Sequence, residues 1–199
     1  MRQATPEDIP DVARLLAAAF ADDPVMSTIW PDTHARAAAL PRYFRSMLTH
    51  HHGPAGGIEL ACTDTTIAAA AVWDPPGRWQ MPTIDLIRSA PQLALALRLQ
   101  VLTAIDVRRT LDRIHPPQPH WYLCHLATDP EYQRHGIGSR LLHSGLDRCD
   151  RRGDSAYLVA TTPTVVPLYQ RAGFTTTRRI HLGRAESAPL DAMWRDPLR

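Results

Sequence analysis

The sequence contains no lysine, and all 22 of its basic residues other than histidine are arginine. This absence excludes Schiff-base chemistry on a lysine amine, and it excludes a P-loop, whose phosphate site requires Gly-Lys-Ser/Thr. A large excess of charge of either sign is also lacking, because the formal net charge is only +2. A charge this small gives no long-range attraction to nucleic acid or to an anionic membrane. We therefore expect neither nucleic acid nor a membrane among the partners of the protein.

Long hydrophobic runs and cysteines are scarce as well. The most apolar window, residues 93–105, is interrupted by Arg98 and Gln100 and is too short and too polar to span a bilayer. The first residues have no apolar stretch of the kind found in a signal peptide, so we expect none. The 3 cysteines are an odd number without metal-ligand spacing. They predict reduced thiols and a cytoplasmic protein that holds no metal.

The length and composition that are present are typical of one globular domain. With 199 residues, 44% of them hydrophobic, the chain can build a single core, so we expect one domain over residues 1–199. Hydrophobic periodicity and turn residues predict an alternation of helices and strands. Helices are predicted at 5–20 (ended by Asp23-Pro24), 32–50, 83–114 with a break at Pro91, 138–152 and 167–172. Strands are predicted at 58–62, 66–73, 121–128, 155–161, 174–182 and 190–194.

The loop at 129–138 joins a predicted strand to the most strongly predicted helix. Backbone N–H groups at the start of a helix have no intrahelical partner, and the helix dipole adds partial positive charge there. Gly136 and Gly138 let an anion approach the backbone closely, and Arg134 adds a full positive charge. The third glycine of a dinucleotide-binding fingerprint is missing. From the loop alone, a phosphate site and an ordinary tight turn into a helix are both open interpretations.

Several ordered motifs resemble those of the GNAT superfamily of N-acetyltransferases. The loop Gln133-Arg134-His135-Gly136-Ile137-Gly138 fits the central Gln/Arg-x-x-Gly-x-Gly/Ala signature, and residues 125–133 resemble its lead-in. Residues 167–174 resemble the later Tyr-x-x-x-Gly-Phe element, and the segments ATPED and AVWDPPG are similar to puromycin N-acetyltransferase-like members. The resemblance is strongest over about residues 119–175. It implies the GNAT fold, an α/β (α+β) fold with a mixed, mostly antiparallel seven-stranded sheet whose fourth and fifth strands splay apart between flanking helices.

The same resemblance implies a binding site for acetyl-CoA. The pantetheine arm would pair with the backbone of Leu126, Ala127 and Thr128 in the gap between the splayed strands. A backbone N–H near Ala127 would stabilise the oxyanion that forms during transfer. The pyrophosphate would be held by the loop residues Gln133, Arg134, His135, Gly136, Ile137, Gly138 and Ser139.

The resemblance also suggests catalytic residues. Tyr169 matches the family's frequent general acid, since a phenol of pKa about 10 can protonate a leaving thiolate of pKa about 8.5. The alternative is a core aromatic whose hydroxyl is bonded to the backbone. For the base, strand alternation places His120 on one face with Tyr122 and Cys124, and His120 is the group there that titrates nearest neutral pH. The alternative is a histidine without a catalytic role. Trp121 and Tyr122 are the candidate contacts to the acceptor.

Other features bear on the base and on metals. Strand alternation puts His125 on the face opposite Cys124. Val159 stands where related members often carry Glu, which removes a base or a substrate contact. Val165 stands where they often carry Asn, which removes a hydrogen bond to the cofactor. The adjacent residues His50–His52 cannot all converge on one ion, so we interpret them as a helix-end cluster and expect no metal.

We expect transfer of an acetyl group from acetyl-CoA to a primary amine of a small molecule, by direct attack in a ternary complex. The protein would act as a monomer or a homodimer. Protein or peptide N-acetylation is an alternative, and an acceptor groove without the cover provided by residues 83–115 would favour it. A non-catalytic acyl-CoA-binding sensor module is a second alternative, because the strand carries no strong base.

Overall fold

A seven-stranded sheet with the order β1-β2-β3-β4-β5-β7-β6 forms the centre of the computed structural model, which describes residues 1–63, 66–182 and 189–198. Strands β4 and β5 pair in parallel, and the other neighbours pair in antiparallel fashion. This arrangement confirms the predicted mixed, mostly antiparallel sheet. The strands are β1 (Arg2–Gln3), β2 (Ile58–Cys62), β3 (Ile67–Asp74), β4 (His120–Thr128), β5 (Ser155–Ala160), β6 (Thr175–Ile180) and β7 (Leu190–Arg195).

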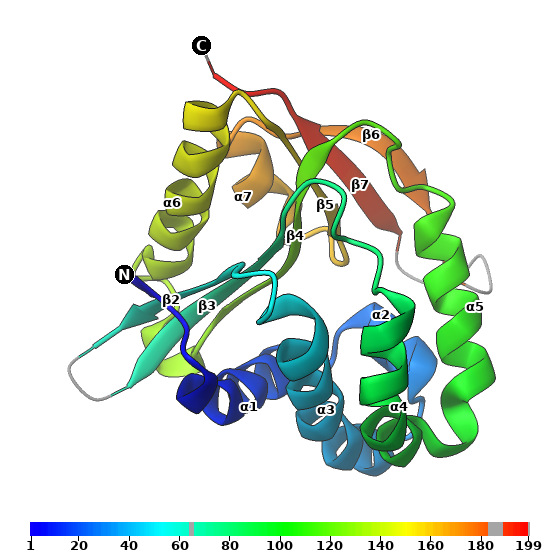
Figure 1. The fold of residues 1–199 in the computed structure, drawn as a ribbon. Helices are drawn as coiled ribbons and strands as arrows, with labels where there is room; N and C mark the ends of the chain where they lie inside the picture. Colours follow the sequence, from blue (N-terminus) through cyan, green and yellow to red (C-terminus); the bar gives the residue numbers. More distant parts are fainter. Residues whose placement is uncertain (64–65, 183–188, 199) are drawn as a thin grey trace.

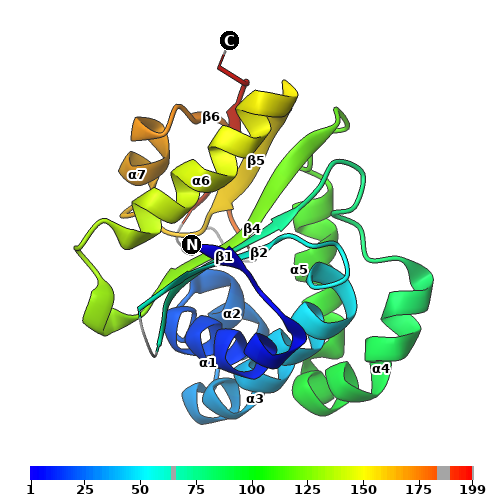
Figure 2. The ribbon, with the colours of Figure 1, turned by 60° about the vertical axis from the view of Figure 1, so that its left-hand side comes forward.

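Helices cover both faces of this sheet (Figures 1 and 2). One face carries α1 (Ile9–Ala19), α2 (Pro24–Ile29), α3 (Thr33–Met47), α4 (Thr83–Leu97) and α5 (Val101–Asp112). The other face carries α6 (Ile137–Arg152) and α7 (Val166–Arg171). Short turns of helix complete the described chain: η1 (Pro6–Asp8), η2 (Leu48–His52), η3 (Arg98–Gln100) and η4 (Pro130–Tyr132).

The alternation of side chains along the strands divides the core into two clusters. On β3, Val72 packs with the α1–α3 helices, while the next residue, Trp73, packs with α6. The contact with α6 is close, because a Cβ atom added at Gly145 would lie 2.6 Å from the Trp73 ring. A glycine at this point of the helix therefore lets α6 pack directly on the sheet. The N-terminal end of α6, together with the loop that precedes it, lies against the end of β4.

Two features of the helices differ from the sequence prediction. The predicted break at Pro91 is wrong, since α4 continues through this proline and the chain bends instead at Arg98, whose φ is 49°. A proline inside a helix removes one hydrogen bond, and the packing of α4 on α3 offsets that loss. The pair Asp23-Pro24 ends the first helix as predicted, but it also begins α2, because the Asp23 carboxylate accepts hydrogen bonds from the amides of Val25 and Met26.

The segment Thr83–Asp112 is long and apolar enough, by length and composition alone, to cross a membrane. In the structure the segment is divided at Arg98 into α4 and α5, and these helices pack against α3 and α2 respectively. Several of its apolar side chains nevertheless face outward, including Leu99 and Leu102, which are 94% and 80% exposed.

Candidate acetyl-transfer site

Strands β4 and β5 separate part of the way along the sheet. They are paired from His120 with Ser155 to Leu123 with Leu158, and beyond that point β4 continues on β3 alone as far as Thr128. Strand β5 continues on β7 alone. The separation confirms the predicted splaying of the fourth and fifth strands, and it leaves one edge of β4 without a neighbouring strand over residues 124–128.

A β-bulge lies at the point of separation. His125 pairs with Val72 and Leu123 pairs with Trp73, so Cys124 is an extra residue in β4. The bulge corrects the predicted alternation, because it turns His125 onto the same face as Cys124. There the His125 ring lies 5.2 Å from the ring of Phe20 and 5.2 Å from that of Phe44. Two successive polar side chains of β4 therefore face the helices α1 and α3.

The loop after β4 has the backbone geometry of an anion site. Arg134 and Gly136 have positive φ angles of 64° and 72°, and Gly136 is the residue that precedes the first turn of α6. The first amide of this helix that bonds within it belongs to Arg140, which donates to the Gly136 carbonyl at 3.0 Å. The preceding amides of the turn are thus available to a ligand, and the loop itself is exposed.

The loop is also fixed tightly against the end of β4. The Gln133 side-chain amide donates to the Thr128 carbonyl at 3.3 Å. A Cβ atom added at Gly138 would lie 2.6 Å from Thr128 Oγ1. The absence of a side chain at Gly138 therefore permits the close approach of helix and strand, and it keeps the amides beside the open edge of β4.

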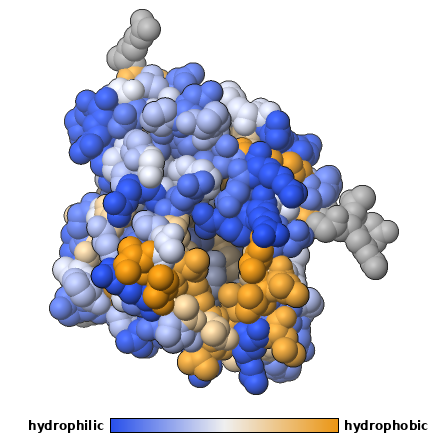
Figure 3. Space-filling model, turned by 45° about the vertical axis from the view of Figure 1, so that its right-hand side comes forward, coloured by the Kyte–Doolittle hydropathy of each residue, from blue (hydrophilic) through white to orange (hydrophobic). Residues whose placement is uncertain are grey.

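A cavity of about 490 Å³ occupies the gap between the splayed strands. Its wall includes Cys124, His125 and Leu126 from β4 and residues 158–162 from β5 and the following turn. On the helical side it is enclosed by α1, α2, α3 and α5, and at the other end it reaches Tyr169 of α7. Figure 3 shows the molecule hollowed between apolar surfaces on the side of α4 and α5. The cavity thus passes through the sheet from one layer of helices to the other.

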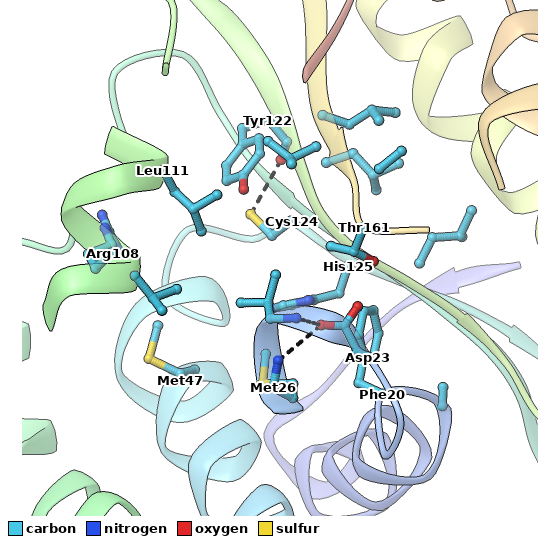
Figure 4. A pocket seen from close by; sticks show the side chains of 18 of the residues that line it. Phe20, Asp23, Met26, Met47, Arg108, Leu111, Tyr122, Cys124, His125 and Thr161 are labelled. Carbon is cyan, nitrogen blue, oxygen red and sulfur yellow. Dashed lines mark hydrogen bonds between the residues drawn. The ribbon is translucent and has the colours of Figure 1, made fainter. Parts of the chain in front are cut away.

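The side chains around the cavity come from several elements (Figure 4). Arg108 and Leu111 of α5 lie across the cavity from Thr161, while Tyr122 and Cys124 line the floor on β4. Met26 of α2 adds to a lining that is mainly apolar. Helix α5 therefore forms a cover over the helical side of the cavity.

Tyr169 stands at the α7 end of the cavity, as the acid prediction requires. Its ring packs on Phe174 with 6.0 Å between ring centres. Within the described residues, its hydroxyl has no hydrogen-bond partner on the backbone or on a side chain. Burial raises the pKa of Tyr169 to about 12, so the phenol stays protonated at neutral pH and can act only as a proton donor there.

The structure places the other predicted β4 residues differently. Tyr122 lines the cavity. Trp121 is not brought to the cavity: it is buried on the α6 face, where its indole N–H donates to Asp154 at 3.1 Å and the Arg148 guanidinium stacks 4.3 Å from its ring centre. Alternation along the strand explains this, since Tyr122 and Trp121 face opposite layers.

His120 is buried beside the cavity and is not part of its wall. Its Nδ1 lies 2.6 Å from the Gln118 carbonyl, which fixes Nδ1 as the donor, and its Nε2 lies 2.9 Å from Nε2 of His115. Burial lowers the pKa of His120. Burial, together with the neighbouring His120, lowers the pKa of His115 to about 3. Both rings are therefore neutral at pH 7, and the assignment of His120 as the base stays a prediction.

A polar cluster that the sequence prediction missed lies on the cavity wall. Asp74, 1% exposed at the end of β3, has its Oδ1 2.8 Å from Nδ1 of His52 and its Oδ2 3.4 Å from Nε2 of His51. The Cys124 thiol donates to the same Oδ2 at 3.1 Å. Burial alone would raise the pKa of Asp74, but the two histidines hold it well below its ordinary value. An ionised carboxylate is therefore kept inside the protein.

The sequence signal for this cluster was that the histidines are adjacent. Their partner Asp74 could not be predicted from it, because Asp74 lies on a strand 22 residues from His52. His51 and His52 converge on one carboxylate, whereas the sequence interpretation treated the run of three as a helix-end cluster. His50 takes no part in the contact with Asp74. The three groups His51, His52 and Asp74 are also the set whose ligand atoms, all within 4.8 Å of one another, could surround a cation.

Comparison with known proteins identifies the class of this site. Residues 102–182 match the family model described as "Acetyltransferase (GNAT) domain". The matched segment includes β4, the loop at 129–138, α6, β5 and Tyr169. Over this segment the chain is therefore similar to a GNAT acetyltransferase domain, and the whole chain has the fold of the GNAT superfamily, whose members use acetyl-CoA.

Among solved structures, the chain is similar to a Corynebacterium glutamicum protein described as "histone acetyltransferase HPA2 and related acetyltransferase", with a TM-score of 0.78 and 29% identity over 100% of this chain and 96% of that one. It shares the fold of arylalkylamine N-acetyltransferase 2 from Aedes aegypti, with a TM-score of 0.63 and 14% identity over 98% and 97% of the two chains. It shares the fold of an agmatine N-acetyltransferase, with a TM-score of 0.61 and 16% identity over 98% and 97%.

Proposed function

We propose that the protein transfers the acetyl group of acetyl-CoA to a primary amine of a small molecule while both substrates are bound. One observation carries this proposal. The cavity joins the gap between β4 and β5 to a chamber that α5 covers, and Tyr169 stands at its far end. A thioester that enters along the open edge of β4 would therefore meet an acceptor that occupies the chamber.

The residues around the gap fit the acetyl-CoA molecule. The unpaired edge of Leu126, Ala127 and Thr128 offers backbone groups to the amides of a pantetheine arm, as an added strand would receive them. At the end of that edge, the free amides from Arg134 to Ser139 and the dipole of α6 favour a pyrophosphate. The crowding of Gly138 on Thr128 sets the distance between these two parts of the site.

Tyr169 supplies the proton for the leaving group in this proposal. The thiolate of coenzyme A is a weaker base than a phenolate, and a phenol held protonated by its burial is available to it throughout the neutral range. In this proposal Tyr169 donates its proton to the sulfur as the carbon–sulfur bond breaks, and a backbone N–H near Ala127 would stabilise the developing oxyanion.

The covered chamber favours a small acceptor over a peptide. A peptide needs an open groove for the residues that follow its reactive amine, and here Val107, Arg108 and Leu111 of α5 stand over the cavity. The mainly apolar lining favours an amine with an apolar body. Relatives in fold include enzymes described as arylalkylamine and agmatine N-acetyltransferases, which fits this choice of acceptor class.

A thiol-release screen tests the proposal. Acetyl-CoA is incubated with arylalkylamines, aliphatic diamines, amino acids and N-terminal peptides, and free coenzyme A is measured with a thiol reagent. We expect turnover with one or more small amines and little with peptides. Turnover restricted to peptides would contradict the acceptor class. Binding of coenzyme A in calorimetry without turnover in any amine series would instead favour a sensor module.

A further inference from the structure

The acetyl transfer needs a base, and the described structure offers four histidines on the cavity wall: His51, His52, His115 and His125. An amine acceptor arrives as an ammonium ion at neutral pH and must lose a proton before its nitrogen can attack. The histidine that accepts this proton becomes a cation inside the protein. Such a cation is costly unless a carboxylate is close to it.

His52 is the histidine with the shortest contact to a carboxylate. We propose that His52 and Asp74 form a histidine–carboxylate pair in which Nε2 of His52 is the general base of the acetyl transfer. The Asp74 carboxylate accepts the Nδ1–H of His52 at 2.8 Å and holds the ring in one orientation and one tautomer. Within the described chain the Nε2 atom has no hydrogen-bond partner, and His52 faces the cavity. This inference rests on the proposed function.

The local backbone explains why this arrangement is possible. Residues Leu48–His52 form a turn of π-helix at the end of α3, closed by the hydrogen bond from the Gly53 amide to the Leu48 carbonyl at 2.8 Å. A π turn is wider than an α turn, so successive side chains diverge less, and such turns are frequent at functional sites. His51 and His52 can therefore both approach Asp74.

The surroundings of Asp74 keep its carboxylate ionised and oriented. Its Oδ2 accepts from the Cys124 thiol at 3.1 Å and lies 3.4 Å from Nε2 of His51, which leaves Oδ1 to His52. Burial raises the pKa of the Cys124 thiol well above its usual value, so Cys124 acts as a neutral donor. The Oδ1 atom of the ionised Asp74 is thus left to a protonated His52.

The other histidines on the wall are worse placed for this role. His125 lies 5.9 Å from His52 between ring centres, and burial followed by the neighbouring His52 lowers its pKa to about 3. His115 is stacked 3.7 Å from Trp79 and has a similarly lowered pKa of about 3. Neither ring has a carboxylate within hydrogen-bond reach among the described contacts, so neither would hold an accepted proton well.

The proton and electron balance of the step is as follows. Nε2 of His52 takes a proton from the acceptor ammonium and becomes an imidazolium, while Asp74 remains ionised. The freed nitrogen lone pair forms a bond to the thioester carbon, and the carbon–sulfur bond then breaks. Tyr169 protonates the departing sulfur, and the second proton of the attacking nitrogen returns to the tyrosine. His52 finally releases its proton to solvent, so the net products are an amide, coenzyme A and one proton.

The test compares His52→Gln, Asp74→Asn and the control His50→Gln, using an amine that the wild-type protein acetylates. His50 belongs to the same π turn but does not line the cavity. We expect His52→Gln to lower kcat by about 100-fold or more, and Asp74→Asn to lower it by about 10-fold or more. The dissociation constant of coenzyme A should stay unchanged in all three variants, and His50→Gln should keep wild-type turnover.

The pH profile separates a base from a structural role. The wild-type kcat/KM should rise with pH and then level off, because the pair of His52 and Asp74, with His51 and His125 packed around it, accepts the proton of the acceptor. In His52→Gln it should rise tenfold per pH unit without levelling, because only the free amine then reacts. Added imidazole should restore turnover to His52→Ala. A pH profile of wild-type shape in His52→Gln, or unchanged kcat, would overturn the proposal.

Chelation and NMR distinguish the base role from metal binding and from a failure of the proposed function. Loss of wild-type activity on chelation, with recovery on adding Zn²⁺, would assign His51, His52 and Asp74 to a metal and overturn the base role.

If no amine is acetylated at all, the proposed function fails, and ¹H–¹⁵N NMR of the histidine side chains still tests the pair. We expect an Nδ1–H tautomer for His52 in the wild-type protein and loss of that preference in Asp74→Asn. An Nε2–H tautomer would refute the pair.

Discussion

Tyr169 shows how burial can prepare one side chain for one direction of proton transfer. Burial raises its pKa to about 12, and the aromatic contact with Phe174 orients its ring. The hydroxyl is therefore protonated throughout the neutral range. A group of this kind can donate to a thiolate, but it cannot serve as the base that deprotonates an ammonium ion.

The substitution Tyr169→Phe removes the hydroxyl and leaves the packing of the ring. We expect kcat to fall by about 100-fold, because the thiolate would leave without a proton. The dissociation constant of coenzyme A, measured by calorimetry, should not change, because the backbone supplies most of that binding. Turnover equal to that of the wild-type protein would show that another group, or water, is the acid.

Single residues differ in how far the sequence predicts them. Tyr169 follows from a local motif, and the structure brings it to the cavity as expected. His52 and Asp74 do not follow from any local pattern, because their contact joins a helix end to a strand end 22 residues apart. Trp121 was assigned to the acceptor site by its position on β4, but the same alternation that faces Tyr122 toward the cavity turns Trp121 toward α6.

At the scale of elements, the loop at 129–138 and the start of α6 act as one unit. The loop must bring its amides to the end of β4 without placing side chains over them. Gly136 provides the left-handed backbone conformation, and Gly138 provides the close contact with Thr128. The unit can therefore be damaged at Gly138 without a change in the core of the domain.

We expect Gly138→Val to weaken the binding of coenzyme A by at least about 10-fold, or roughly 1.4 kcal/mol. The added side chain would meet Thr128 Oγ1, whose distance to a Cβ atom would be 2.6 Å, and it would push the amides out of line. Isothermal titration calorimetry measures the effect. Gly153→Asn is the matched control at the other end of α6, because Asn tolerates a φ of 69° and nothing lies near that Cβ. Equal affinity in both variants would argue against a pyrophosphate at this loop.

The elements also show where sequence patterns stop being informative. Strand β4 was predicted almost to the residue, but the bulge at Cys124 was not, because it arises from pairing with β3 and leaves no mark in the hydrophobic pattern. The π turn at Leu48–His52 is a similar case, since the same residues would fit an α-helical end. Both irregularities lie at the cavity, where they redirect polar side chains out of the regular alternation.

At the scale of the whole molecule, the two layers of helices carry different chemistry. The α6 side is a continuous apolar cluster around Trp73 and Leu142. The α1–α5 side is apolar near α1 and α3, but toward the cavity it contains several imidazoles: His120 is buried, and His115 and His125 are partly buried. The order of the sheet brings these groups together at the separated ends of β4 and β5, so one side of the fold combines core packing with ionisable groups.

This distribution makes the stability of the molecule sensitive to mild acid. In the folded protein the pKa values of His115 and His125 are each lowered to about 3, chiefly by burial, while in the unfolded chain they return to about 6.5. Between these values the unfolded chain binds more protons than the folded one. The stabilising contribution of these neutral rings is therefore complete above pH 6.5 and decreases as the pH falls, with a limit of about 1.4 kcal/mol per pH unit for each group.

We expect the free energy of unfolding, measured by urea denaturation between pH 5.0 and 7.5, to decrease toward the acid end of this range. In His125→Phe the slope should be smaller by about one proton, because the substituted ring cannot ionise and can pack between Phe20 and Phe44 in the same place. The variant should thus be less stable relative to wild type at pH 7.5 than at pH 5.0. Parallel curves for the two proteins would mean that His125 has the same proton affinity in the folded and unfolded states, and that water reaches its ring in the core.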